Sequence, residues 1–288
     1  MELETEIHVR VQTATGRDAP VVAPALQVRR QMQQEPEATP VMYQTWRDVL
    51  FLHWEWEPGE IQATLPPGLY VDTFGEKAYV GMFPFRMTDV RASFLPEIPG
   101  ARDFLELNVR TYVYDRHGRP GVWFYSLDLN HGLGVLMAKI FYSLPYHSAT
   151  MEAKNHAGLL EYKCQRQSGA ETSVIFYRKE PQPVGALPGS LPFFLAERYL
   201  LYSYSTRTHK LYTARVHHSP WELFHAHLGK YDETMLRLNN LNPRLRPPDH
   251  RWIGSPVRVK IYALEQAYGG GAETPGNANS PCHFPSRE

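Results

Sequence analysis

A carboxylate, an amide, a guanidinium and a phenol alternate along one short segment of the chain. The segment 105–113 carries Glu106, Asn108, Arg110 and Tyr112 at every second position. Successive side chains of a β-strand point to opposite faces, so these four would share one face of a strand. A guanidinium can hold a carboxylate through two hydrogen bonds, and a carboxyl group can move a proton. The pattern predicts a site for a small anionic ligand, bound by Arg110 and Asn108, with Glu106 as acid or base.

The next segment of the chain supplies a hairpin partner for this strand. A turn at 115–120 separates the two, and pairing of Tyr114 with Gly121 would place Arg110 opposite Tyr125. A polar and aromatic surface would then extend across both strands. We therefore include Tyr125 among the predicted ligand-binding residues. Asp128, further along the partner strand, is also included, as a residue that could complete a buried polar network.

The location of this polar face decides whether it is a site. The other face of 105–113 carries Leu, Leu, Val, Thr and Val, which is typical of a core. If the polar face is exposed to water, Glu106 and Arg110 form only a weak ion pair. If it lines an interior, its ionised groups must be paired or bound to a ligand. Arg198 is a further binding candidate, and the alternative there is a charge exposed at a helix end.

Other motifs indicate neither a metal, nor a cofactor, nor a common nucleophile. Thirteen histidines include the cluster His217, His218, His225 and His227, but no established zinc spacing occurs. The sequence has no Gly-x-Ser-x-Gly, and its Gly-Leu-Gly at 132–134 lacks a third glycine. We therefore expect no metal and no cofactor.

Composition limits the class of protein. Thirty basic and thirty acidic residues balance, so a nucleic acid partner is not expected. The two cysteines, more than a hundred residues apart, provide no disulfide framework, and no apolar run is long enough to span a membrane. We expect a cytoplasmic protein whose partner is a small carboxylate-bearing molecule, with a homo-oligomer left open.

The chain divides into one folded unit and two tails. Residues 1–40 and 267–288 are polar and rich in Pro, Gly or Ser, which predicts disorder, and 41–266 form a single β-rich domain. Helices are predicted after Pro58, at 132–142, after Ser190 and at 232–239. Strands are predicted at 49–56, 77–86, 105–114, 122–129, 148–153, 159–165, 172–179, 199–203, 211–217 and 257–263. This pattern predicts a mainly β fold, a curved antiparallel barrel or cone with a few short helices.

Several ordered motifs resemble the YqjF-like family of uncharacterised bacterial proteins. The resemblance covers about 42–264 and includes Leu-Pro-Pro-Gly-Leu at 65–69, the segments 106–113 and 121–128, Leu-Pro-Tyr at 144–146, Glu-Arg-Tyr at 197–199 and His-Ser-Pro-Trp at 218–221. That family is distantly similar to the acetoacetate decarboxylase superfamily, which implies a curved β fold around a small pocket. Glu106 would match a glutamate of that pocket.

The resemblance also implies a difference in chemistry. Acetoacetate decarboxylase forms a Schiff base through a lysine, and Tyr146 and His147 stand where its paired lysines would be. Without a lysine there, decarboxylation of acetoacetate through an imine is not expected. Lys139 is nearby, but its predicted helix is expected to point it outward.

Three hypotheses remain. The favoured one is a lyase-like or isomerase-like enzyme that acts by acid-base chemistry on a small oxo or hydroxy carboxylate, with Glu106, Tyr146 and His147 as catalytic residues. The second is a protein that binds such a molecule without reacting with it. The third is a structural or assembly role in which exposed sheet edges drive oligomerisation.

Overall fold

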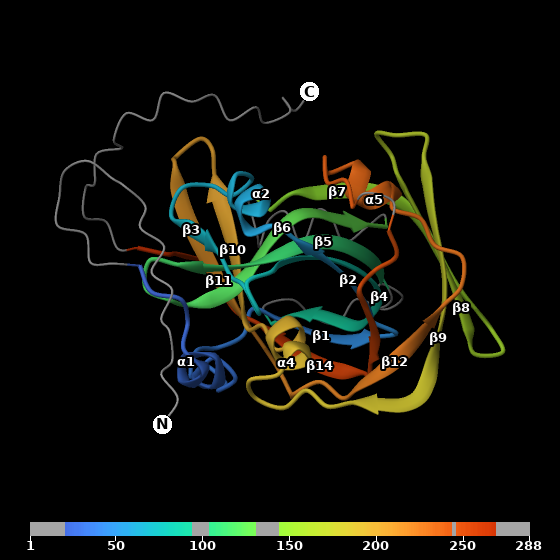
Figure 1. Ribbon diagram of the computed structural model, residues 1–288, viewed down its shortest axis with the longest axis horizontal. Helices are drawn as coiled ribbons and strands as arrows, with labels where there is room; N and C mark the ends of the chain where they lie inside the picture. The colour runs from blue at the N-terminus through green and yellow to red at the C-terminus, as the bar shows by residue number, and fades with distance from the viewer. Residues whose placement is uncertain (1–20, 94–103, 131–143, 244–245, 269–288) are drawn as a thin grey trace.

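The computed structural model describes residues 21–93, 104–130, 144–243 and 246–268. Strands dominate it (Figure 1), as the recurrent β-branched and aromatic residues predict. The described strands form one fifteen-stranded sheet. They are β1 Met42–Arg47, β2 Leu50–Trp56, β3 Leu69–Val71, β4 Ala78–Ala92, β5 Phe104–Asp115, β6 Pro120–Leu129, β7 Tyr146–His156, β8 Leu159–Arg166, β9 Thr172–Val184, β10 Leu200–Ser205, β11 Lys210–His218, β12 Leu223–Leu228, β13 His250–Gly254, β14 Val257–Ile261 and β15 Glu265–Gln266.

The sheet branches on both sides of three long central strands. β5 pairs with β4 along one edge and with β6 along the other. The outer edge of β4 is shared by β2, opposite 78–82, and by β1, opposite 86–92. The outer edge of β6 is shared by β10 near its start and by β7 near its end. One branch runs through β1, β14, β11 and β10, and the other through β2, β13, β12, β9, β8 and β7.

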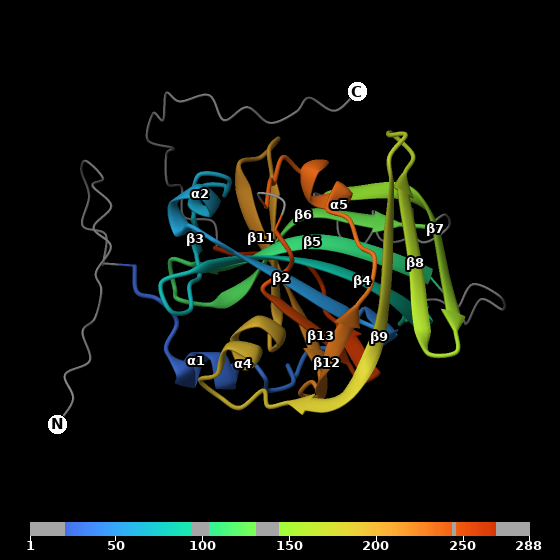
Figure 2. The same ribbon diagram turned by 45° about the vertical axis from the view of Figure 1, so that its right-hand side comes forward.

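The predicted mainly β fold with few short helices is confirmed, but the sheet is not a true barrel. Its two branches close into neighbouring rings that share β4, β5 and β6 (Figure 2). The first ring contains β1, β14, β11 and β10, and the second contains the other branch. Two pairings are parallel, β6 with β7 and β6 with β10. Parallel neighbours need a long connection, and residues 130–145 supply one.

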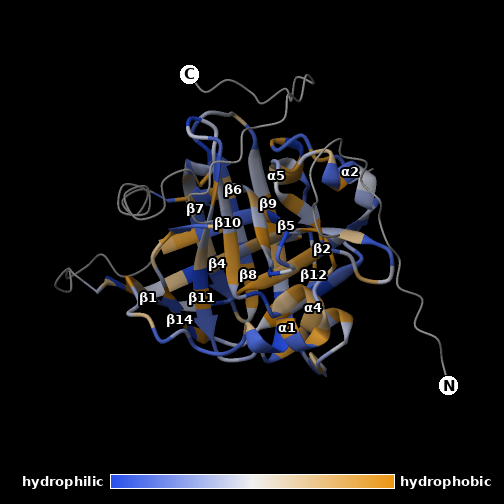
Figure 3. Ribbon diagram, turned by 90° about the vertical axis from the view of Figure 1, so that its left-hand side faces the viewer, coloured by the Kyte–Doolittle hydropathy of each residue, from blue (hydrophilic) through white to orange (hydrophobic). Residues whose placement is uncertain are grey.

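The central strands separate two interiors. On β5, Glu106, Asn108 and Arg110 face the first ring, and Leu107 and Val109 belong to the apolar core of the second. Hydrophobic and hydrophilic residues are interspersed along the strands (Figure 3). The predicted apolar face is confirmed. The alternative of a polar face exposed to water is wrong, because Glu106 is only 5% exposed and Asn108 only 4%.

The helices are short, and most begin where the sequence predicts. They are α1 Leu26–Gln31, α2 Pro58–Gln62, α4 Leu191–Ala196 and α5 Thr234–Arg237. Ser190 caps α4, since its hydroxyl oxygen accepts a hydrogen bond from the backbone N–H of Phe193 at 3.3 Å. The helix predicted at 132–142 lies outside the described residues. No helix in the described part is long and apolar enough to cross a membrane.

Five strands escape prediction from the sequence: β1, β3, β12, β13 and β15. Most are short, and β1 places two polar residues at its centre, which hides the alternation of a half-buried strand. Both are buried, Gln44 at 3% exposure and Thr45 at 8%. This omission matters, because β1 forms part of the first ring.

The N-terminal segment is more ordered than its composition predicts. Residues 1–20 lie outside the described residues. Helix α1 falls within the predicted tail 1–40, and it lies beside α4 (Figures 1 and 2). No residue of α1 is buried, and Arg29 attaches it by donating two hydrogen bonds of 2.7 Å to Asp72. An ion pair with a distant residue leaves no compositional signal. In the predicted tail 267–288, Tyr268 contacts Arg116, and 269–288 lie outside the described part.

Gly121 lies where β6 passes β10, and a side chain there has no room. An ideal Cβ at Gly121 would lie 2.7 Å from the backbone oxygen of Leu200 and 2.7 Å from the ring of Tyr202. We expect Gly121→Ala to lower the free energy of unfolding by about 1–3 kcal/mol, as over-packing does. Gly59→Ala is the control, because a Cβ there meets nothing within 4 Å. Equal urea midpoints for the two variants would contradict this packing.

Candidate functional site

A cavity of about 80 Å³ lies inside the first ring of strands. This volume admits several water molecules or a small organic molecule. Its wall contains six phenylalanine and tryptophan side chains: Trp46, Phe51, Phe83, Phe85, Phe124 and Trp221. Polar residues also border it: Gln44, Glu106, Asn108, Arg110, Tyr146, Arg198 and His218. An apolar wall with a few convergent polar groups is typical of a site for a small molecule.

Glu106 is the carboxyl group of the cavity. Its Oε1 accepts a hydrogen bond of 3.1 Å from Asn108 Nδ2. Burial raises the pKa of Glu106 to about 7, against the opposing effects of Asn108 and Arg110. Near neutral pH this carboxyl group can therefore exist in both protonation states. Asn108 Oδ1 is buried and has no hydrogen-bond partner in the described part of the chain.

Arg110 is the cation nearest to Glu106 along β5. Its guanidinium carbon lies 3.8 Å from the centre of the Phe83 ring, a cation–π contact. Arg110 forms no ion pair within the described residues, and its buried Nε has no partner there. Burial lowers the pKa of Arg110, with Tyr112 and Glu106 opposing this effect. A half-buried cation without a carboxylate partner favours binding of an anion.

Two more of the predicted residues border the cavity. Tyr146 begins β7, and burial, together with the charge of Glu106, raises its pKa well above the usual value for tyrosine. Its hydroxyl therefore stays protonated at neutral pH and can donate. Arg198 follows α4 and donates from Nη1 to Asp72 at 2.6 Å and from Nε to the Phe194 oxygen at 2.7 Å. Arg198 Nη2 is buried and has no partner in the described part.

The pairing of β5 with β6 differs from the predicted register. Arg110 pairs with Phe124, where the prediction places Tyr125, so the register is wrong by one residue at this end. Beyond it, Val109 pairs with Ser126, as predicted. The extra residue between the two registers is Tyr125, which forms a bulge on β6. Sequence patterns do not show where such an extra residue lies.

The bulge turns Tyr125 away from the cavity. Because one extra residue reverses the alternation of a strand, Phe124 and Leu127 both face the cavity on either side of it. The Tyr125 hydroxyl instead lies 2.7 Å from Thr64 Oγ1, and its ring packs against the second core. The structure does not bring Tyr125 to the site.

Asp128 and His147 also lie outside the residues that border the cavity. Both carboxylate oxygens of Asp128 accept hydrogen bonds from Arg166, from Nε at 2.7 Å and from Nη2 at 2.9 Å. The Asp128 side chain is fully buried, so this bidentate pair belongs to the interior of the domain. His147 follows Tyr146 on β7 and points to the other face of the strand.

His218 borders the cavity, although the sequence analysis does not place it there. Its Nδ1 lies 2.8 Å from the backbone oxygen of Ser219, and its ring stacks on Tyr199 at 4.6 Å between centres. Burial lowers the pKa of His218 to about 4, so the imidazole is neutral at pH 7. Its signals in the sequence were its place in the histidine cluster and in the motif His-Ser-Pro-Trp at 218–221. Trp46 was not predicted to border the cavity, because its strand, β1, was not predicted from the sequence.

The histidine cluster singled out in the sequence does not form a metal site in the described part of the chain. His225 and His227 share the exposed face of β12, and His218 is buried against the cavity. No group of three or more His, Cys, Asp or Glu side chains that could hold a metal ion occurs among the described residues.

A family model matches residues 43–257 of the chain, under the name DUF2071 and the description of an uncharacterized conserved protein. The chain belongs to this family. The matched region of the DUF2071 family runs from β1 to the first residue of β14, and so contains Glu106, Asn108, Arg110, Tyr146 and Arg198. The uncharacterized protein YqjF of Bacillus subtilis (strain 168) is 42% identical over 192 residues, which are 66% of this chain and 78% of that protein. The predicted membership of the YqjF-like family is confirmed.

Solved structures share the fold of this DUF2071 protein. The enduracididine biosynthesis enzyme MppR, complexed with pyruvate, has a TM-score of 0.56 and 13% identity over 81% of this chain and 93% of MppR. Acetoacetate decarboxylase from Legionella pneumophila has a TM-score of 0.56 and 12% identity over 81% of this chain and 92% of its own. An acetoacetate decarboxylase-like enzyme from Sphingomonas wittichii has a TM-score of 0.55 and 11% identity over 80% and 94%. These likenesses show the predicted acetoacetate decarboxylase-like fold.

Proposed function

We propose that the cavity binds a small oxo or hydroxy carboxylate and that the protein acts on it by acid-base chemistry. Arg110 would hold the carboxylate, Glu106 would move the proton, and Tyr146 would serve as a second acid. The observation that carries the proposal is the pair on β5. A carboxyl group with a pKa of about 7 and a guanidinium without an ion-pair partner in the described residues face one cavity.

The protonation states suit the two proposed roles. A general acid or base works best when its pKa lies near the working pH, which holds for Glu106. The phenol of Tyr146 keeps its proton, so it can donate to an oxygen on which negative charge develops. His218 is neutral, so it adds no positive charge that would compete with Arg110 for the carboxylate of the ligand.

The proposed chemistry does not use an imine. No described residue of the cavity wall is a lysine, and Lys139 lies outside the described residues. MppR is named as complexed with pyruvate, which supports a small oxo acid as the ligand class here. The second candidate is binding without reaction. It is favoured by the largely apolar wall, whose described part also contains no cysteine or serine nucleophile.

Ligand-dependent unfolding tests the proposed binding. A ligand that binds only the folded state at a hundred times its dissociation constant stabilises it by about 2.7 kcal/mol. We expect pyruvate or lactate to raise the unfolding temperature of the wild type, and their neutral amides to have less effect. The gain should disappear in Arg110→Met, which keeps the apolar stem and removes the charge.

Arg258→Met is the matched control, because Arg258 is exposed on β14 and the chemical change is the same. It should respond to lactate like the wild type. If no carboxylate of three or four carbons stabilises the wild type, the proposed function is wrong. If Arg110→Met still responds, the carboxylate is bound elsewhere.

A further inference from the structure

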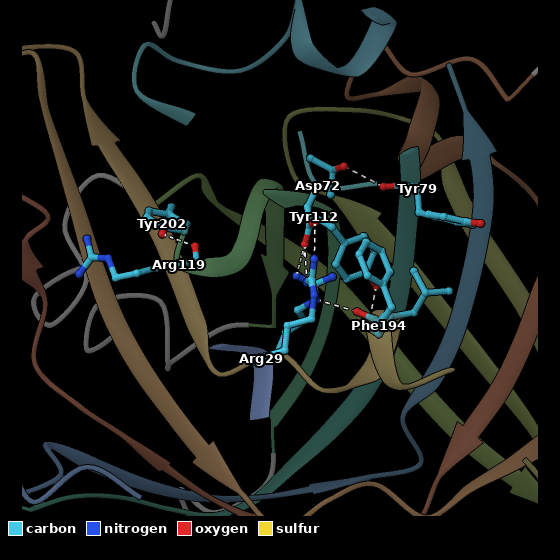
Figure 4. A network of polar contacts seen from close by, with 10 residues as sticks. Arg29, Asp72, Tyr79, Tyr112, Arg119, Phe194 and Tyr202 are labelled. Carbon is cyan, nitrogen blue, oxygen red and sulfur yellow. Dashed lines mark hydrogen bonds and ion pairs between the residues drawn. The ribbon is translucent and has the colours of Figure 1, made fainter. Parts of the chain in front are cut away.

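The N-terminal strap, residues 26–35, reaches the cavity wall through a chain of charged groups. Arg29 donates from both Nη atoms to the two oxygens of Asp72 at 2.7 Å. Arg198 Nη1 donates to the same carboxylate at 2.6 Å. Figure 4 shows Arg29 beside Asp72, Tyr112 and Phe194. The family model begins at residue 43, so the strap lies outside the matched region.

Arg198 is held at every nitrogen except one. Nη1 is bound to Asp72 and Nε to the backbone oxygen of Phe194, whereas the buried Nη2 has no partner in the described part. The Phe194 ring contacts both cations, with Arg198 at 4.2 Å and Arg29 at 4.9 Å. Since Arg198 borders the cavity, Nη2 is the donor that it can offer to a ligand.

The two arginines share one carboxylate. Asp72 is 1% exposed, so its charge is poorly screened by water. With Arg29 in place, the cluster of two guanidinium groups and one carboxylate keeps one positive charge in excess. Without Arg29, Asp72 would neutralise Arg198 alone and could turn an oxygen toward Nη2. Arg29 thus controls both the charge and the free donor of Arg198.

The second cavity arginine lies close to this cluster. The guanidinium carbon of Arg198 is 4.8 Å from the centre of the Tyr112 ring, and that of Arg110 is 5.9 Å from it. A ligand held by Arg110 would therefore lie within reach of the charge of Arg198. Glu106 and Glu197 are the carboxyl groups that could offset this charge, and Glu197 is bound to the Trp221 N–H at 2.8 Å and to the Tyr199 hydroxyl.

Further contacts hold the strap against the same wall. Gln33 Nε2 donates to Glu197 at 3.4 Å, and Arg215 donates to the backbone oxygens of Met32 at 2.8 Å and Gln34 at 3.0 Å. Glu197 precedes Arg198 in the chain, and Arg215 on β11 pairs with Leu200 on β10, so these contacts fix the strap close to Arg198.

We propose that the N-terminal strap supports the cavity from outside, with Arg29 as a positioning residue that acts through Asp72 to keep Arg198 Nη2 free for the carboxylate of the ligand. This inference rests on the proposed function, since it assigns a second cation to the same carboxylate site. Asp72 would be the link between strap and site, and Arg198 the group that touches the ligand.

Calorimetric titration with lactate tests the inference. We expect Arg29→Met to bind lactate roughly tenfold more weakly than the wild type, the scale of one lost charge-assisted hydrogen bond. Arg30→Met is the matched control, because Arg30 is the next residue of α1 and is exposed. Its affinity should equal that of the wild type.

A double-mutant cycle separates positioning from a general loss of structure. Arg198→Lys keeps a positive charge beside Asp72, but its single ammonium group cannot bind Asp72 and the ligand at once as two nitrogens of a planar guanidinium can. If Arg29 acts through Arg198, the double variant should bind lactate no more weakly than Arg198→Lys alone. Additive losses, or wild-type affinity in Arg29→Met, would overturn the inference while leaving the proposed function intact. Absence of carboxylate binding to the wild type would instead remove the proposed function.

Discussion

Replacing Arg166 with alanine is expected to lower the free energy of unfolding by about 3–5 kcal/mol, because it leaves a buried carboxylate without its cation. Asp128 is fully buried, and the Arg166 side chain is 7% exposed. Their two hydrogen bonds, of 2.7 and 2.9 Å, use both oxygens of Asp128. Urea unfolding followed by circular dichroism measures the loss.

Two further variants show whether the geometry of the pair matters. Arg166→Lys should recover only part of the loss, since an ammonium group cannot reproduce the two parallel hydrogen bonds. Lys163→Ala, on the same strand, should change stability by less than about 1 kcal/mol, as exposed ion pairs do. The Lys163 side chain is 38% exposed and pairs with Glu161 at 2.8 Å. A loss of less than about 1 kcal/mol in Arg166→Ala would mean that this pair contributes no more to stability than an exposed ion pair.

The pair of Asp128 and Arg166 is a contact that local sequence patterns do not predict. The polar residues of β5 were predicted because their alternation is local and has period two. Asp128 was predicted to bind ligand as a residue that could complete a buried polar network. Its true partner, Arg166, lies on β8, two strands away along the second branch. Nothing in the local pattern connects the two residues.

The bulge at Tyr125 limits prediction in another way. A single extra residue moves every side chain on one side of it to the opposite face. The predicted register therefore holds at Val109 and fails at Arg110. The composition of β6 is strand-like on both sides, so the position of the bulge depends on tertiary packing that the sequence does not display.

The cavity wall combines predicted and unpredicted elements. β5 carries Glu106 and Arg110, which the alternating pattern indicates, and the start of β7 carries Tyr146, which the family resemblance indicates. β1 and the N-terminal strap were missed, since β1 has two buried polar residues at its centre and α1 buries no residue. In both cases long-range contacts override weak local preference. Arg29, which shares Asp72 with Arg198, thus belongs to a segment that composition alone assigns to a tail.

Glu106 should make the stability of the folded protein depend on pH in a direction opposite to that of an ordinary carboxylate. Burial raises its pKa from 4.5 to about 7. Between these values the folded state holds a proton that the unfolded state has lost, so raising the pH favours unfolding. Relative to a variant that cannot titrate, the wild type should lose about 3 kcal/mol of stability from this residue between pH 4.5 and pH 8.

Glu106→Gln is that variant, since the amide keeps the size of the side chain and carries no titrating proton. Urea unfolding of both proteins at intervals from pH 4.5 to pH 8 gives the difference, in which other titrating groups largely cancel. The difference in free energy of unfolding between the two proteins should change with pH below about pH 7 and be constant above it. Glu152→Gln is the control, because Glu152 is an exposed carboxylate, and it should follow the wild-type profile in this range.

The same comparison connects stability with function. A carboxylate ligand beside Glu106 disfavours the ionised form of Glu106. Saturating lactate should therefore move the pH-dependent loss of stability of the wild type to higher pH, and it should have no such effect in Glu106→Gln. Once a substrate is known, Glu106→Gln should lower its turnover by about 10²–10⁴-fold, the usual contribution of a general acid or base. Parallel stability profiles of the wild type and Glu106→Gln would mean that Glu106 is ionised throughout this range in the folded protein. The proton transfer proposed for it would then have to be assigned to another group.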